Sequence, residues 1–141
     1  MSTYPKKLLG LTDIEGVGKI YSDKLKQYGV HSLKDLLRKA GTSRERIKMS
    51  SATGIPASTI LRWACQAELL IIDGIDPEYV ALLVAAGVDS APELVLRDPK
   101  TLHDKMVRVN KQKNLVRNVP LEKEIARWVK QILKSPYRLS F

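Results

Sequence analysis

The sequence predicts an all-α protein, and three observations indicate this fold class. Apolar residues recur three and four positions apart along most of the chain, which is the spacing of one helix face. Capping residues and glycines stand at the ends of these stretches, where helices begin and end. No segment shows the sustained alternation of apolar and polar residues that is typical of a strand.

A duplication organises the chain. Residues 14–37 align with residues 72–95 at a constant offset of 58, and eight of the 24 aligned positions are identical. The motif Ile-x-Arg-Trp-x-x-Gln also occurs twice, at residues 60–66 and 125–131, where the offset is 65. About seven residues (65 − 58) are therefore added inside the second copy. The sequence predicts two related helical halves, packed as one compact unit: residues 1–71 and residues 72–141.

Four helices are predicted in the first half. Ser32 and Thr42 are N-capping residues, Glu45 completes a capping box with Thr42, and Gly29 suits the turn that ends the first helix. The predicted helices cover about residues 19–28, a short stretch after Ser32, residues 42–52, and a longer stretch from Pro56 to Ile71.

The second half is predicted to repeat this order. Asp76-Pro77 and Asp98-Pro99 each combine an N-capping residue with a proline at the first helical position. Between them, Ser90 begins another helix with capping-box spacing. The last helix is predicted over about residues 121–134. For the tail, residues 135–141, the sequence leaves open whether it is disordered or docks as a peptide.

Charge is distributed unevenly along the 141 residues. The chain holds 24 Lys and Arg against 15 Asp and Glu, a net charge of +9. Counting by segment gives 8 − 4 = +4 for residues 1–41, 4 − 2 = +2 for 42–71, 1 − 6 = −5 for 72–99 and 11 − 3 = +8 for 100–141. Such an excess favours a polyanionic partner. The basic surface is therefore expected at the two ends, with an acidic segment between them.

Composition excludes several classes of protein. A single cysteine excludes a disulfide scaffold and is typical of a reducing compartment, so we expect a cytoplasmic protein. No apolar run approaches the roughly 18 residues of a membrane span, and no membrane partner is expected. No His, Cys, Asp and Glu cluster has metal-ligand spacing, and no nucleophile stands in a recognisable catalytic pattern. We therefore predict a non-enzymatic protein without metal, cofactor or small-molecule substrate.

The most specific local motif is a Gly-x-Gly turn that leads directly into the first predicted helix. Gly16, Val17 and Gly18 are followed by Lys19, which begins that helix. Two glycines allow a sharp turn and a close approach of backbone to a ligand. The free N–H groups at the start of a helix, together with the positive end of its dipole, attract an anion. The alternative is a tight turn between helices that binds nothing.

At these residues the sequence resembles the helix-hairpin-helix family. The family pattern of Gly-hydrophobic-Gly, a helix and a closing Gly-hydrophobic pair is matched from Gly16 through Leu25 to Gly29-Val30. The resemblance implies tandem helix-hairpin-helix repeats with longer intervening helices. It also implies that backbone amides of the hairpin bind a DNA phosphate oxygen without recognising base sequence. The whole layout further resembles an uncharacterised bacterial domain family with two such hairpins.

The second copy departs from this pattern. Aspartate replaces the second glycine at Asp76, and further acidic residues surround the turn. Its helix, residues 79–86, is apolar nearly all round, which suits burial between other elements. We therefore expect residues 72–95 to serve as scaffold or as a protein-binding surface.

A second basic feature lies between residues 100 and 117. Clusters of this kind make phosphate contacts that are dependent on salt and independent of sequence. A solvated helix end is the alternative for any single lysine here. The predicted nucleic-acid-binding residues are Gly16, Val17, Gly18, Lys19 and Lys24 at the hairpin, and Lys105, Arg108, Lys111, Lys113 and Arg117 in this cluster.

The sequence thus predicts a non-enzymatic module that binds nucleic acid, with DNA expected and RNA left open, through the phosphate backbone. The alternative is a protein-interaction or assembly adaptor that keeps the hairpins but does not bind nucleic acid. The acidic, apolar second copy motivates this alternative.

Overall fold

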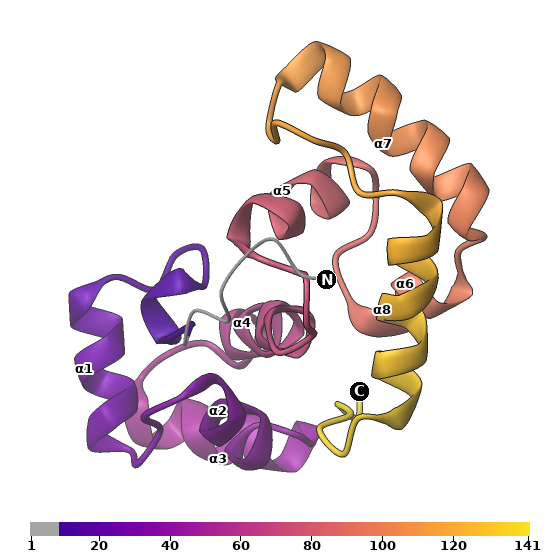
Figure 1. Ribbon diagram of the computed structural model, residues 1–141. Coiled ribbons are helices and arrows are strands. Elements are labelled where there is room, and N and C mark those ends of the chain that lie inside the picture. Colours follow the sequence, from indigo (N-terminus) through magenta and orange to yellow (C-terminus); the bar gives the residue numbers. More distant parts are fainter. Residues whose placement is uncertain (1–8) are drawn as a thin grey trace.

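The computed structural model describes residues 9–141, and this part of the chain is all-helical, with no strand (Figure 1). The predicted fold class is confirmed at this level. The first eight residues of the predicted first half lie outside the described residues. The elements are a short 3-10 helix η1 (Leu11–Asp13) and the α-helices α1 (Lys19–Gln27), α2 (Leu33–Lys39), α3 (Ser43–Thr53), α4 (Ala57–Leu70), α5 (Pro77–Ala85), α6 (Ala91–Leu96), α7 (Pro99–Lys113) and α8 (Glu122–Lys134).

The helices repeat in the order that the duplication predicts. Helices α1 and α5 begin and end 58 residues apart, and α4 and α8 begin 65 residues apart. The capping side chains of Ser32, Thr42, Asp76, Ser90 and Asp98 each accept a hydrogen bond from the backbone N–H three residues later. The added residues of the second copy lie in α7, which is longer than α3, and in the connection to α8.

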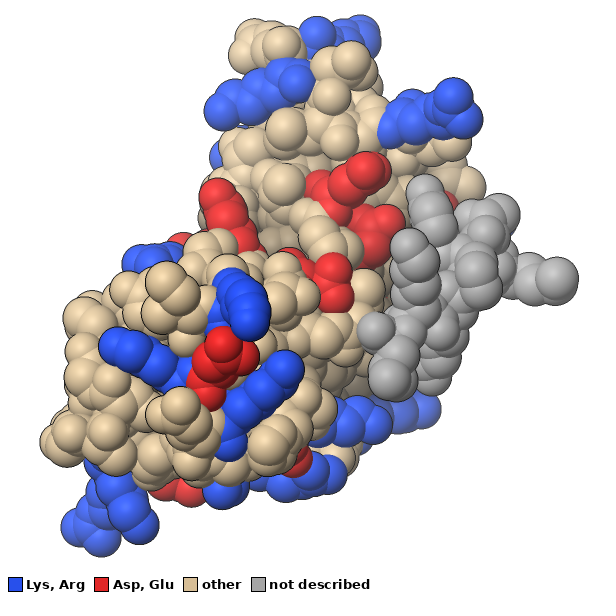
Figure 2. All heavy atoms as spheres, turned by 90° about the vertical axis from the view of Figure 1, so that its left-hand side faces the viewer, with Lys and Arg blue, Asp and Glu red and all other residues tan. Residues whose placement is uncertain are grey.

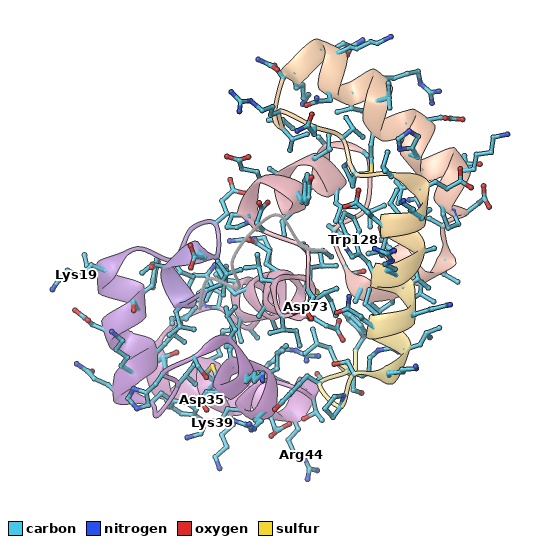
Figure 3. The ribbon with its side chains drawn as sticks, viewed as in Figure 1. Lys19, Asp35, Lys39, Arg44, Asp73 and Trp128 are labelled. Carbon is cyan, nitrogen blue, oxygen red and sulfur yellow. The ribbon has the colours of Figure 1, made fainter. Side chains whose placement is uncertain are left out.

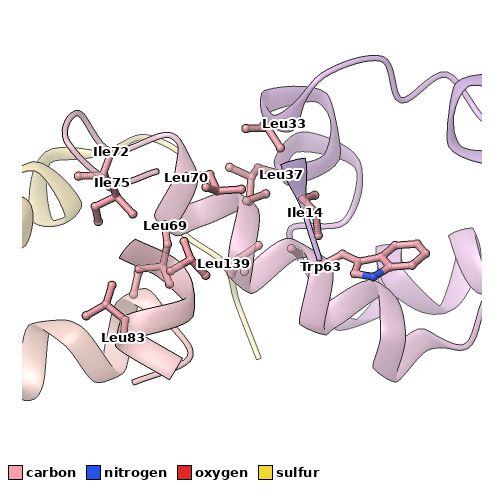
Figure 4. Packing of buried hydrophobic residues seen from close by; sticks show 14 of the residues in the cluster. Ile14, Leu33, Leu37, Trp63, Leu69, Leu70, Ile72, Ile75, Leu83 and Leu139 are labelled. Carbon is pink, nitrogen blue, oxygen red and sulfur yellow. The ribbon is translucent and has the colours of Figure 1, made fainter. Parts of the chain in front are cut away.

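Helix α4 lies at the centre of the molecule (Figure 1). Residues Trp63, Ala64 and Gln66 through Leu70 are all buried, so this helix is covered on most of its sides. Figure 4 shows Leu69 and Leu70 between buried residues of the first half and buried residues of the second. The buried apolar side chains of the two halves form one cluster.

Each turn before α1 and α5 rests on a buried tryptophan. The Tyr21 and Trp63 rings lie 5.1 Å apart at their centroids, and the equivalent Tyr79 and Trp128 rings lie 5.7 Å apart. Both indoles are buried, as expected for core positions. Such edge-on and tilted aromatic contacts stabilise a protein beyond the area they bury.

The tail of the chain folds back from α8 onto the first half (Figure 1). Leu139 is buried, and its N–H donates to Glu68 Oε2 at 3.0 Å. The Ser140 carbonyl accepts from the guanidinium of Arg46 at 2.7 Å, and the Ser140 N–H donates to the Gly41 carbonyl at 2.8 Å. Of the two alternatives that the sequence left open, the structure shows the docked tail.

Two charged side chains are almost completely buried beneath this tail. Arg46 is 4% exposed and also donates to the Ala40 carbonyl, while Glu68 is 1% exposed and lies 3.7 Å from Arg138. Burial raises the pKa of Glu68 above 4.5, its ordinary value, against the opposing effects of the Leu139 N–H and Arg138. The tail therefore attaches to the first half through groups that would be costly to bury unpaired.

The contact between Gly74 and Trp128 allows a first prediction. Gly74 has φ +93°, and a Cβ at this position would lie 3.0 Å from Trp128 Nε1, whereas Gly54 has φ +77° and open space around it. Gly54→Ala should lower the free energy of unfolding by about 1 kcal/mol, the cost of left-handed backbone alone. Gly74→Ala should lower the free energy of unfolding more than Gly54→Ala does, because the added Cβ also meets Trp128. Urea denaturation measures both variants, and equal losses would contradict a steric role for Trp128.

Glu68 gives a second prediction, on pH. Because the pKa of Glu68 is raised in the folded protein, the folded state binds the proton more tightly, and stability falls as pH rises through that pKa. Glu68→Gln keeps an acceptor for the Leu139 N–H and removes the titration. The stability of Glu68→Gln relative to the original chain should therefore increase from about pH 4 to about pH 8 in urea denaturation. A relative decrease over this range would contradict the effect of burial.

Candidate nucleic-acid interface

The two copies build the same turn. The Val17 N–H donates to the Ile14 carbonyl at 3.1 Å, and the Ile75 N–H donates to the Ile72 carbonyl at the same distance. Gly16 has φ +91°, close to the +93° of Gly74, and this left-handed backbone favours glycine at the third position of the turn. The first glycine of the motif is therefore needed by the turn itself, in both copies.

In each half, a glutamine from the fourth helix is hydrogen-bonded to the backbone of the turn. The side-chain oxygen of Gln66 accepts from the Glu15 N–H at 2.9 Å, and that of Gln131 accepts from the Asp73 N–H at 2.9 Å. In the second copy the Gln131 amide nitrogen also donates to the Asp73 carbonyl at 3.3 Å. The Ile-x-Arg-Trp-x-x-Gln motif thus supplies both the tryptophan and the glutamine that position each turn.

The start of α1 presents free backbone donors. Gly18 is the N-cap, with extended backbone and no side chain to accept a hydrogen bond. The hydrogen bonds of the helix begin with the Ser22 N–H, which donates to the Gly18 carbonyl at 2.9 Å. The N–H groups of Lys19, Ile20 and Tyr21 therefore have no acceptor within the helix.

The start of α5 is closed by its own side chains. Asp76 is the N-cap, and its carboxylate accepts from the Tyr79 N–H at 2.9 Å. Pro77, at the first helical position, has no N–H. In the second copy a carboxylate therefore occupies the place where the first copy could hold an anion.

The side chains around the α1 terminus combine charge with one exposed apolar group. Lys19 points away from the body of the molecule (Figure 3) and its Nζ lies 3.8 Å from Asp23, an exposed pair that contributes little to stability. The Lys24 Nζ lies 6.0 Å from the centre of the Tyr21 ring. Ile20 is 75% exposed beside the free amides, a residue that the sequence analysis did not single out. Its exposure follows from its place in the first turn of α1, outside the apolar face that packs on Trp63.

The basic cluster of the second half lies around α7. Arg108, Lys111, Lys113 and Arg117 are exposed, and Lys105 is half-buried with its Nζ close to Gly87, at the end of α5. Four of the five predicted residues are therefore open to solvent, and the fifth lies at a helix end.

An acidic depression lies between the first turn and the start of α5, and Gly16, Val17 and Gly18 of the hairpin are part of its lining. A hollow of about 610 Å³ is lined by the first turn, by Gln66 and by the start of α5, and Asp13 and Glu15 contribute carboxylates to it. Figure 2 shows Asp and Glu side chains gathered between the lower lobe, which carries α1, and the upper part of the molecule. The predicted residues at the hairpin and on α7 are thus not joined into one positive surface on this face.

Three further observations concern metal ligands, the cysteine thiol and membrane spans in residues 9–141. No group of three His, Cys, Asp or Glu side chains is placed to hold a metal ion there. Burial raises the pKa of the Cys65 thiol to about 11, which keeps it protonated and unreactive near neutral pH. None of the helices in this range has both the length and the hydropathy of a membrane span.

A family model described as "Domain of unknown function (DUF4332)" matches residues 15–134. The chain belongs to the DUF4332 family. The match begins in the first turn and ends at the last residue of α8, so the DUF4332 unit contains both copies of the repeat, and the docked tail follows it. No curated protein and no solved structure matches the chain at a significant level.

The different N-caps of α1 and α5 allow a third prediction. A Cβ at Gly18 would meet no atom within 4 Å, and its backbone suits any residue. Gly18→Asp should therefore raise the free energy of unfolding by a few tenths to about 1 kcal/mol, because the carboxylate accepts from a free N–H. The reverse change, Asp76→Gly, should lower it by a similar amount. Thermal or urea denaturation tests both, and a clear loss of stability in Gly18→Asp would contradict an open N-cap.

Proposed function

We propose that the protein is a non-enzymatic nucleic-acid-binding module that holds a phosphate group of the backbone at the start of α1. In this proposal each turn with the helix that follows it is a helix-hairpin-helix motif. The first motif binds, and the second serves as scaffold. DNA is the expected partner, and a reducing cytoplasm is the expected compartment.

The difference between the two N-termini carries the proposal. Within one fold, α1 keeps three N–H groups free and α5 keeps one, since Pro77 lacks the donor and Asp76 accepts from another. A phosphate at α1 would gain hydrogen bonds from these amides and a favourable interaction with the helix dipole. Lys19 and Lys24, both exposed on the same helix, would add positive charge.

Backbone contacts of this kind imply little base specificity. Amides and lysines that contact phosphate fix position and supply affinity, while bases are distinguished by side chains that reach their edges. The exposed Ile20 stands next to the amides, where it can contact the sugar of the bound nucleotide. Arg108, Lys111, Lys113 and Arg117 stay predicted as a second, separate region of phosphate contact.

Fluorescence anisotropy with random-sequence duplex and single-stranded DNA at several salt concentrations tests the proposal. We expect dissociation constants of roughly 10⁻⁴–10⁻⁶ M, with affinity falling as salt rises. Gly18→Asp should weaken binding at least tenfold, about 1.4 kcal/mol, because its carboxylate competes with the phosphate for the same donor.

The matched control is Gln27→Glu, which adds the same charge at the exposed far end of α1. It should weaken binding much less than Gly18→Asp. If the two variants weakened binding equally, the effect of Gly18→Asp would come from net charge alone, and this would contradict a phosphate site at the start of α1. Binding no tighter than millimolar at low salt, or no change in Gly18→Asp, would exclude the proposed site.

A further inference from the structure

The hollow beside the first turn has the chemistry of a binding surface for a cationic segment. Asp13 and Glu15 line it together with the apolar residues Val17, Pro77 and Val80. Its volume of about 610 Å³ is within the range of sites that take a ligand. The hollow therefore combines negative charge with an apolar floor, in a chain whose net charge is +9.

Gln66 adds a buried polar group to this hollow. The side chain is 9% exposed, lines the hollow, and uses its oxygen to hold the Glu15 N–H. The second bond of its counterpart, from Gln131 Nε2 to the Asp73 carbonyl, has no equivalent at Gln66 within residues 9–141. An amide donor is thus available for the carbonyl of an incoming backbone.

A rigid basic tip is found elsewhere on the same chain, at the end of α7. The side-chain oxygen of Asn110 accepts from the N–H groups of Leu115 and Val116 at 2.8 and 3.0 Å, and its nitrogen donates to the Val116 carbonyl. This arrangement fixes the turn after the helix. The exposed cations on and beside this tip are Lys111, Lys113 and Arg117.

The tip projects beyond α5 at the top of the molecule (Figure 1), and Figure 2 shows basic side chains there and acidic ones in the depression below. Opposite charges on two separate surfaces of one chain favour contact between copies, because each copy offers both partners. Nucleic acid is a poorer occupant of the hollow, since its phosphates would meet Asp13 and Glu15.

We propose that the basic tip of α7 in one copy docks into the acidic hollow of a second copy. The two surfaces differ, so the contact is head-to-tail, and each docked copy leaves one tip and one hollow for further copies. This self-association goes beyond the proposed function, although the hollow shares Gly16, Val17 and Gly18 with the hairpin.

Sedimentation velocity of the full chain, free of nucleic acid, tests the proposal over a range of protein and salt concentrations. At low salt the mass should rise above the 15.8 kDa of one chain as protein concentration increases, and high salt should return it to monomer. Lys111→Glu with Lys113→Glu should weaken association at least tenfold. Glu15→Lys with Glu78→Lys should do the same, since Glu78 is exposed next to Pro77.

Mixing these two double variants is the decisive measurement. Each alone places like charges at both surfaces, whereas the mixture pairs an acidic surface with a basic one at every contact, so association should return. The control for Lys111→Glu with Lys113→Glu is Arg44→Glu with Lys48→Glu, which makes the same change in net charge on α3. It should leave association unchanged. Gly18→Asp adds a carboxylate to the lining of the hollow, so it should self-associate at least as strongly as the original chain while its DNA binding falls, which separates this proposal from the phosphate site.

Three results would overturn the proposal: a monomer under all conditions, association that neither double variant weakens, or a mixture that stays monomeric.

Discussion

The burial of α4 is the constraint on which the rest of the structure depends. A helix covered on most sides buries polar side chains, and an unpaired buried group costs free energy; on α4, Trp63 Nε1 and Glu68 Oε1 are buried without a hydrogen-bond partner among the described residues. Gln66 satisfies its oxygen at the first turn, and Glu68 accepts from the backbone of the tail. One helix therefore positions both the candidate site and the end of the chain, and Trp63 on the same helix supports the turn from below.

The duplication explains why the two halves are alike in structure and different in surface chemistry. The residues that build each turn are repeated: the left-handed glycine, the tryptophan and the glutamine. The residues that face outward have diverged. Where α1 carries the exposed Lys24, α5 carries the buried Leu82, because the longer α7 packs on α5. In the second half a neighbouring helix thus covers a position that is open to solvent in the first half, and Asp76 caps α5 where Gly18 stands before α1.

Much of the fold could be predicted from local patterns. The caps at Ser32, Thr42, Asp76, Ser90 and Asp98 act within four residues of sequence, so spacing alone located these helix starts. The docked tail could not be found in this way. It depends on Arg46 and Glu68, whose charge suggests solvent exposure, and on partners more than 70 residues away. The acidic hollow is likewise assembled from the first turn and α5, which no local pattern connects. The position of the basic cluster relative to the hairpin depended on the same long-range packing.

The buried tryptophans have a further consequence, an optical one. The chain contains two tryptophans, and each lies beneath the turn of its own half. Tryptophan fluorescence, excited selectively over the tyrosines, therefore comes from two equivalent positions and from no other indole. A chain in which one of them is replaced by phenylalanine would report on the remaining half alone. Because of the duplication, each of the two turns has its own intrinsic fluorophore.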